Sequence, residues 1–165
     1  MALTTQQKQT LKAAIDADPA LASLPNNSDG AFAIAAILNQ TASPAYYVWR
    51  TEIQIDEVMQ NGFDWTRVDN LTVGKARIWD WMMTTGTLVP SRSNVRAGVL
   101  AVFGTAGDLA TRLAIFTHFQ RAATRFEKIF AAGTGTAATE QGTGPSTMML
   151  ESPVSYQDVE EARNS

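Results

Sequence analysis

An abrupt change of composition near residue 133 constrains the fold of this chain more than any other feature. Residues 133–147, GTGTAATEQGTGPST, are rich in Gly and Thr and contain no large apolar side chain. Such a segment has little to bury in a core, so it predicts a flexible linker. We therefore divide the 165 residues into a body, 1–132, and a linker with a C-terminal arm, 133–165.

Helix signals run through the whole body. Thr4 with Gln7, and Thr124 with Glu127, fit capping boxes, in which two side chains bind each other's free backbone donors. Residues 31–40, AFAIAAILNQ, are apolar almost all round, which is typical of a helix buried on several sides. The expected fold is all-α, a compact multi-helix bundle with an extended, Gly/Thr-linked C-terminal arm. Further helices are predicted over 51–60, 71–84, 94–103, about 108–121 and 125–131, with a short aromatic stretch at 46–49 that also fits an extended segment.

The arm beyond the linker has the features of a docking peptide. Ser155 with Asp158 can cap a last helix, from Tyr156 to Arg163. A peptide with apolar anchors on a flexible linker would become ordered when it binds a partner. A frayed C-terminus is the plainer alternative. The predicted partner-binding residues are Met148, Leu150, Tyr156, Asp158, Glu160 and Glu161.

The net charge of −3 is unevenly spread along the chain. Residues 86–130 hold 6 basic and 2 acidic side chains, whereas residues 131–165 hold 1 basic and 5 acidic. Opposite charges on body and tail favour attraction between neighbouring copies, or of the tail onto its own body. The predicted basic stripe between subunits comprises Arg112, Arg121, Arg125 and Lys128. Phosphates of a nucleic acid are an alternative ligand for this stripe.

The residues that usually carry catalysis are scarce. The chain has no Cys, which excludes disulfides and thiolate chemistry, and His118 is its one histidine, which excludes a zinc site made of several histidines. No Gly-x-Ser-x-Gly turn or P-loop is present, and adjacent carboxylates such as Asp56 and Glu57 point apart on a helix. We therefore expect no enzyme activity, no catalytic residues, no metal and no cofactor.

The tryptophans and the apolar runs bear on two further functions, nucleic-acid binding and membrane association. Trp49, Trp65, Trp79 and Trp81 could stack on bases beside arginines, but at helical spacing core packing is the commoner role. No run approaches 18 apolar residues, and no signal peptide is visible after Met1, so we expect no membrane association.

Several stretches together resemble small structural proteins of tailed bacteriophage virions. These stretches cover most of the chain: LTTQQKQTLKAAIDADPAL, DGAFAIAAILNQTASPAYYVWRT, DNLTVGKARIWDWM and ATRFEKIFAAGTGT with the ending SYQDVEEARN. A helical body with a C-terminal arm is similar to the head–tail connector, or adaptor, proteins of the virion neck. No short diagnostic motif carries this assignment, so it is an analogy of build.

The resemblance implies a structural role. Such connectors form rings, typically of twelve copies, beneath the portal protein and join the capsid to a tail or nozzle protein. It implies a homo-oligomeric ring in the virion neck, assembled in the bacterial host cytoplasm and traversed by viral DNA, with no membrane partner. The alternatives are another virion component, such as a tail-completion or capsid-associated protein, and a DNA-binding module.

Overall fold

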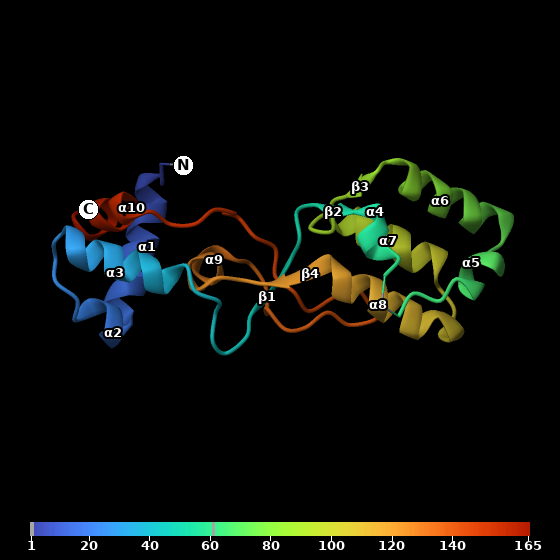
Figure 1. The fold of residues 1–165 in the computed structure, drawn as a ribbon, viewed down its shortest axis with the longest axis horizontal. Coiled ribbons are helices and arrows are strands. Elements are labelled where there is room, and N and C mark those ends of the chain that lie inside the picture. The colour runs from blue at the N-terminus through green and yellow to red at the C-terminus, as the bar shows by residue number, and fades with distance from the viewer. Residues whose placement is uncertain (1, 61) are drawn as a thin grey trace. The chain divides into compact units, whose positions relative to one another are not determined.

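The computed structural model describes residues 2–60 and 62–165 of the chain. It divides into two compact units, each assembled from separate stretches of sequence (Figure 1). Unit 1 comprises Met1–Ala45, Ala123–Ala131 and Met149–Ser165, and unit 2 comprises Tyr46–Ala122 and Ala132–Met148. The compact units therefore differ from the division predicted at residue 132, because residues 133–148 and 149–165 belong to different units.

The all-α prediction is wrong, although helices dominate. Of the part of the chain that is described, about 53% is helical and about 9% is strand, in small antiparallel sheets. The strands are two or three residues long, so each lacks the alternating pattern over four or more residues that would reveal it. Tyr47–Trp49 pairs with residues far along the chain, and this pairing carries no local signal.

Unit 1 is helical. It contains α1 (Thr5–Ala17), α2 (Pro19–Ala22), α3 (Ser28–Leu38), α9 (Arg125–Phe130) and α10 (Tyr156–Arg163). The capping boxes at α1, α9 and α10 all form. The core of the unit joins Leu11 and Ile15 of α1 with Ile34 and Leu38 of α3 and Phe126 of α9.

The C-terminal helix α10 is an integral part of unit 1. It packs against both α1 and α3 and buries Val159 and Ala162 completely (Figure 1). The preceding extended segment is held by Asn39, whose side chain donates to the Val154 carbonyl at 2.9 Å and accepts from the Val154 amide at 3.0 Å. At the helix end, Lys12 donates to the Ser165 carbonyl at 2.7 Å.

Unit 2 is built around α6 (Val73–Thr84), α7 (Ser93–Val102) and α8 (Leu109–Phe119). Helix α7 packs against both α6 and α8 and lies between them in Figure 1. Trp79 stacks on Phe63 at 5.6 Å and meets Phe103 edge-on at 5.0 Å, which closes the aromatic centre of the core. The shorter elements are α4 (Ile55–Val58), α5 (Thr66–Asp69) and the 3₁₀ helix η1 (Ala106–Asp108).

Two small antiparallel sheets complete unit 2. Strand β1 (Tyr47–Trp49) pairs with β4 (Gln120–Ala122), with Val48 opposite Arg121. Strand β2 (Ile53–Gln54) pairs with β3 (Thr87–Leu88), with Ile53 opposite Leu88. The predicted helix over 51–60 therefore begins as a strand and becomes the short α4, and the helix predicted to about residue 121 ends at Phe119.

The Gly/Thr-rich segment, predicted as a flexible linker, is hydrogen-bonded to β1 within unit 2. The Tyr47 amide donates to the Gly135 carbonyl at 2.8 Å, and Ser146 accepts from the Trp49 amide and donates to the Tyr47 carbonyl, each at 2.9 Å. The Tyr46 hydroxyl lies 2.6 Å from the Ser146 hydroxyl. Gly135 has φ +67°, and a Cβ there would lie 2.1 Å from the Tyr46 ring. Glycine therefore allows this segment to lie against the aromatic strand.

No single helix among the described residues is long and apolar enough to cross a membrane. Helix α7 and the run Ala106–Phe119 are together long and apolar enough for a membrane span by length and composition, but they are bent by 117° relative to each other.

Candidate functional site

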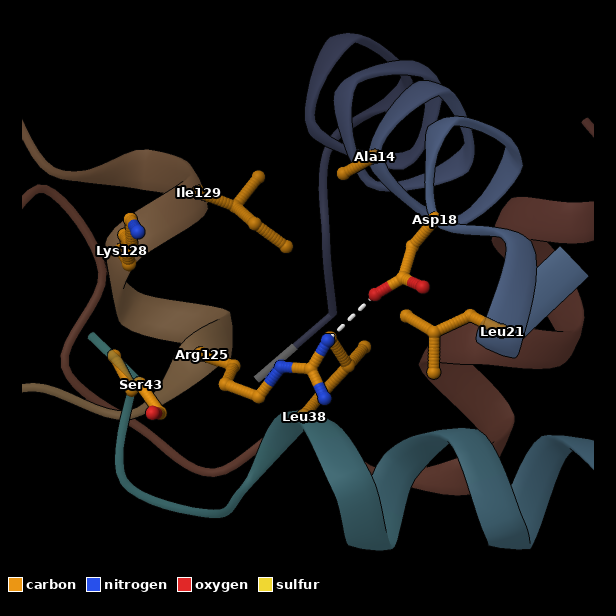
Figure 2. Close-up of a pocket in the computed structure, with 9 residues that line it drawn as sticks. Ala14, Asp18, Leu21, Leu38, Ser43, Arg125, Lys128 and Ile129 are labelled. Atoms are coloured by element: carbon orange, nitrogen blue, oxygen red, sulfur yellow. Dashed lines mark hydrogen bonds and ion pairs between the residues drawn. The ribbon is translucent and has the colours of Figure 1, made fainter.

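A pocket of about 310 Å³ lies within unit 1 and receives side chains from α1, α2, α3 and α9 (Figure 2). Asp18, the N-cap of α2, reaches across it to Arg125 of α9, with an N–O distance of 2.6 Å. Both side chains are about one third exposed, at 31% and 35%. The remaining lining residues are Ala14, Leu21, Leu38, Ala42, Ser43, Lys128 and Ile129.

The pocket is suited to structure more than to chemistry. Its carboxylate is already paired with its guanidinium, and the Asp18 side chain also accepts from the Ala20 amide at 3.0 Å. The Asp18–Arg125 pair is neutral, and Lys128 is the remaining charged residue in the lining. None of the lining residues is a histidine that could act as a base.

The four residues of the predicted basic stripe lie in different units. Arg125 and Lys128 are on α9 in unit 1, whereas Arg112 on α8 and Arg121 on β4 are in unit 2. Arg125 is paired with Asp18. Arg121 donates to the Ala122 carbonyl at 3.1 Å and approaches the Met148 sulfur at 3.3 Å. The four side chains therefore do not form one stripe within either unit.

The predicted partner-binding residues of the arm make contacts with other residues of their own chain. Leu150 is buried in the core of unit 1, and Tyr156 stacks on Phe32 of α3 with ring centroids 4.0 Å apart. The carboxylate of Asp158 caps its own helix by accepting from the Ser155 amide at 3.0 Å. Their binding to a partner stays a prediction.

The two last acidic residues of the arm, Glu160 and Glu161, contact the N-terminal helices of unit 1. Glu161 pairs with Lys8 of α1 at 2.6 Å, although its side chain stays 56% exposed. Glu160 accepts a long hydrogen bond of 3.5 Å from the Ser28 hydroxyl. Met148, in unit 2, is half-buried beside Arg121.

An exposed apolar face lies on α6 of unit 2. Trp81 and Val73 are each 78% exposed, and Ile78 is 41% exposed. Beside Trp81 lies a hollow of about 310 Å³ lined mainly by apolar groups: Ile78, Trp81, Met82, Thr85, Leu88, Asn94, Val95 and Gly98. Large apolar side chains gathered in this way are typical of a surface that another molecule covers.

A second apolar face lies on α8, the other helix that packs against α7 (Figure 1). Leu109 and Leu113 are 42% and 41% exposed. Leu113 borders a hollow of about 400 Å³ whose other lining residues are small or polar: Gly62, Ala110, Ala114, Thr117 and His118. Unit 2 thus presents two different apolar surfaces, one on α6 and one on α8.

A polar cluster joins α5, α6 and η1 within unit 2. Asp108 is 7% exposed, and its carboxylate accepts from the Thr105 hydroxyl at 2.7 Å and from the Thr105 amide at 3.0 Å. Burial by itself would raise the pKa of Asp108, but these hydrogen bonds and the charges of Arg67 and Lys75 outweigh it and hold that pKa below its usual value. The cluster borders a pocket of about 230 Å³.

Metal-binding clusters of three or more His, Asp or Glu side chains are absent from residues 2–60 and 62–165. Two acidic side chains near α4 and α5, Glu57 and Asp64, have partners within the chain. Glu57 receives two hydrogen bonds from Arg50, at 2.7 and 3.2 Å, which with the Gln54 amide lower its pKa. Asp64 accepts from the hydroxyl and the amide of Thr66.

The apolar face of α6 is the site that sequence reasoning missed. The pattern places Ile78 and Met82 on one line of the helix with Trp79 and Trp81 beside it, and core packing is the expected role of the tryptophans. The structure buries Trp49 and Trp79 but leaves Trp65 56% and Trp81 78% exposed. Trp79 and Trp81 are two positions apart, which is about 200° around a helix, and this angle is the signal that they cannot share one face.

No family model matches the chain, and neither a curated protein nor a solved structure does. The case for a function therefore depends on the residues and surfaces described above and on the resemblance in the sequence.

Proposed function

We propose that the chain is a non-enzymatic structural protein of a tailed-phage virion, a head–tail connector subunit that forms a ring beneath the portal protein. The resemblance of the sequence to small virion proteins supports the proposed position in the virion neck. The observation that carries the assembly role is the pair of exposed apolar faces on α6 and α8 of unit 2.

Two different apolar surfaces on separate helices of one unit suit a ring. In a cyclic ring each subunit uses one surface toward the next copy and a different surface toward the previous one. The face of α6 protrudes through Trp81, and the face of α8 is hollowed beside Ala110 and Ala114. Contact between such faces would remove Trp81 from water, and burying apolar surface contributes about 25 cal/mol for each Å².

Self-association tests the assembly role. Trp81→Asp places a charge in the proposed interface and should weaken self-association at least about tenfold, because an unpaired carboxylate would be buried. Sedimentation velocity over a range of protein concentrations measures it. Met149→Asp is the matched control, since Met149 is also exposed, at 75%, but lies in unit 1. Equal association by both variants and the unchanged protein would contradict the role of this face.

Localisation of the protein in phage particles tests its proposed position in the virion neck. A connector occupies a single vertex of the capsid, so a labelled copy should appear once per particle, at the neck. Labels spread over the shell would instead support a capsid-associated protein. A DNA-binding module predicts a steep loss of duplex affinity as salt rises, and a titration at low salt would detect it.

A further inference from the structure

Arg112 is a largely buried cation without an ion pair to any of the described residues. It lies on α8 of unit 2 and is 7% exposed. Its Nε is fully buried and has no hydrogen-bond partner. Among the residues that the structure describes, no ion pair or hydrogen bond with Arg112 is formed. In folded proteins an arginine that is more than nine-tenths buried usually has such a partner.

The carboxylate closest in sequence does not serve Arg112. Asp108 precedes it by four positions on the same side of the helix, but the carboxylate of Asp108 is held by Thr105 and lies 4.0 Å from Arg67. Ile115 and Phe116, three and four positions further along α8, are completely buried. A largely buried guanidinium is costly unless it is paired, because it loses hydration.

We propose that Arg112 receives a carboxylate from a second copy of the chain, so that the pair is completed only on assembly. A guanidinium binds a carboxylate through two parallel hydrogen bonds, and the pair is strongest where water is excluded. The inference rests on the proposed assembly of copies and names one contact in it.

Two observations favour a protein carboxylate over the phosphates of a nucleic acid. Binding along a phosphate backbone needs several cations on one surface. Of the other residues of the predicted stripe, Arg125 and Lys128 belong to the other unit, and Arg121 donates to the Ala122 carbonyl. The chain also has exposed aspartates with no hydrogen bond or ion pair among the described residues, so every copy carries carboxylates to offer. These are Asp16, Asp29, Asp56, Asp69 and Asp80.

The experiment separates stability from assembly. At a concentration at which sedimentation shows a monomer, Arg112→Met should raise the midpoint of thermal unfolding by at least about 3 °C, because it removes an unpaired, largely buried charge. In sedimentation velocity at higher concentration, the same variant should self-associate at least about tenfold more weakly. Arg77→Met is the control, because Arg77 on α6 is exposed and its removal should change neither quantity.

A second set of variants identifies the donor. One of the five aspartates, changed to Asn, should weaken self-association as much as Arg112→Met does but leave the thermal midpoint of the monomer unchanged. Arg112→Lys keeps the charge without the planar fork and should fall between the wild type and Arg112→Met in association.

Three results would overturn the inference. A lower thermal midpoint, or loss of folding, in Arg112→Met would mean that the residue has a stabilising role within the chain. Unchanged association in that variant would mean that no copy supplies its partner, and so would a set of aspartate variants that all associate normally. If Arg112→Met associates normally while Trp81→Asp does not, the contact is wrong but the proposed assembly stands. If labelled copies are absent from the neck, the proposed position there fails whatever the Arg112 variants do.

Discussion

Gly30 lies inside α3, a place where alanine would ordinarily be the better helix former. The backbone of Pro25 passes so close that a Cβ on residue 30 would lie 1.9 Å from the Pro25 carbonyl oxygen. Gly74, in the first turn of α6, has nothing within 4 Å of such a Cβ. The two glycines therefore have opposite structural meanings, although both are helical.

Substituting alanine at both glycines tests this difference. Gly30→Ala should destabilise unit 1 by about 2 kcal/mol or more, because the backbone must move to relieve the clash. Gly74→Ala should stabilise the protein by about 0.5–1 kcal/mol through the lower entropy of the unfolded chain. Urea unfolding measures both. Stabilisation by Gly30→Ala would show that Pro25 does not approach as described.

Asp108 predicts how the stability of unit 2 depends on pH. Because the pKa of its carboxyl is lower in the folded than in the unfolded chain, the stabilisation is fully present above the usual value of 3.8 and is lost as pH falls below it. Unfolding in urea, followed between pH 7 and pH 3, should show this loss. Asp108→Asn should be less stable at pH 7 and lose less on acidification; an identical pH slope in both proteins would contradict the assignment.

At the scale of elements, most helices could be predicted from the sequence, but of the strands only β1 was anticipated, as an extended stretch at 46–49, and its partner was not. Helix signals are local: Thr4 with Gln7 and Ser155 with Asp158 lie three residues apart, and these capping boxes form as expected. The strands depend on residues far apart, such as Tyr47 and Ala122. The Gly/Thr-rich segment also reads as a linker, because its order depends on backbone bonds to β1 that composition does not reveal.

The candidate site was predictable only in part, for the same reason. The charges of Arg125 and Lys128 stand out in the sequence, but the pairing of Arg125 with Asp18 requires α9 to reach the N-terminus of α2. The exposure of Trp81 depends on which side of α6 faces α7, which the pattern of the helix leaves open because both sides carry a tryptophan.

Adjacent residues at the start of the C-terminal segment test its role as an element of unit 1. Leu150 is 5% exposed and belongs to the core, whereas Met149 is 75% exposed. Leu150→Ala should cost about 2–4 kcal/mol, because it leaves a cavity, and Met149→Ala should stay within about 0.5 kcal/mol of the wild type. Urea unfolding followed by far-ultraviolet circular dichroism gives both values. A small effect of Leu150→Ala would favour a loosely held arm.

At the scale of the whole molecule, each unit has its own apolar core, one centred on Leu11, Ile34 and Val159 and the other on Trp49, Phe103 and Phe116. The four tryptophans of the chain, at 49, 65, 79 and 81, all lie in unit 2. Tryptophan fluorescence therefore reports on unit 2 alone.

This separation of cores predicts that core substitutions act on one unit at a time. Phe103→Ala should lower the unfolding midpoint seen by tryptophan fluorescence, with a loss of about 3–5 kcal/mol. Leu150→Ala should leave the fluorescence midpoint unchanged while it lowers one transition in calorimetry. Equal shifts of the fluorescence midpoint in both variants would instead mean that the two units unfold as one.

The discontinuous build of unit 1 has a consequence for biosynthesis. Its core is closed by α10, which is made last among its helices, so α1 and α3 are synthesised long before the surface that covers them. A nascent chain that ends before Tyr156 lacks α10 and leaves open the surface of α1 and α3 that α10 covers. Chains without α10 would then expose apolar surface of the kind that proteases and chaperones recognise, and chains that contain it would not.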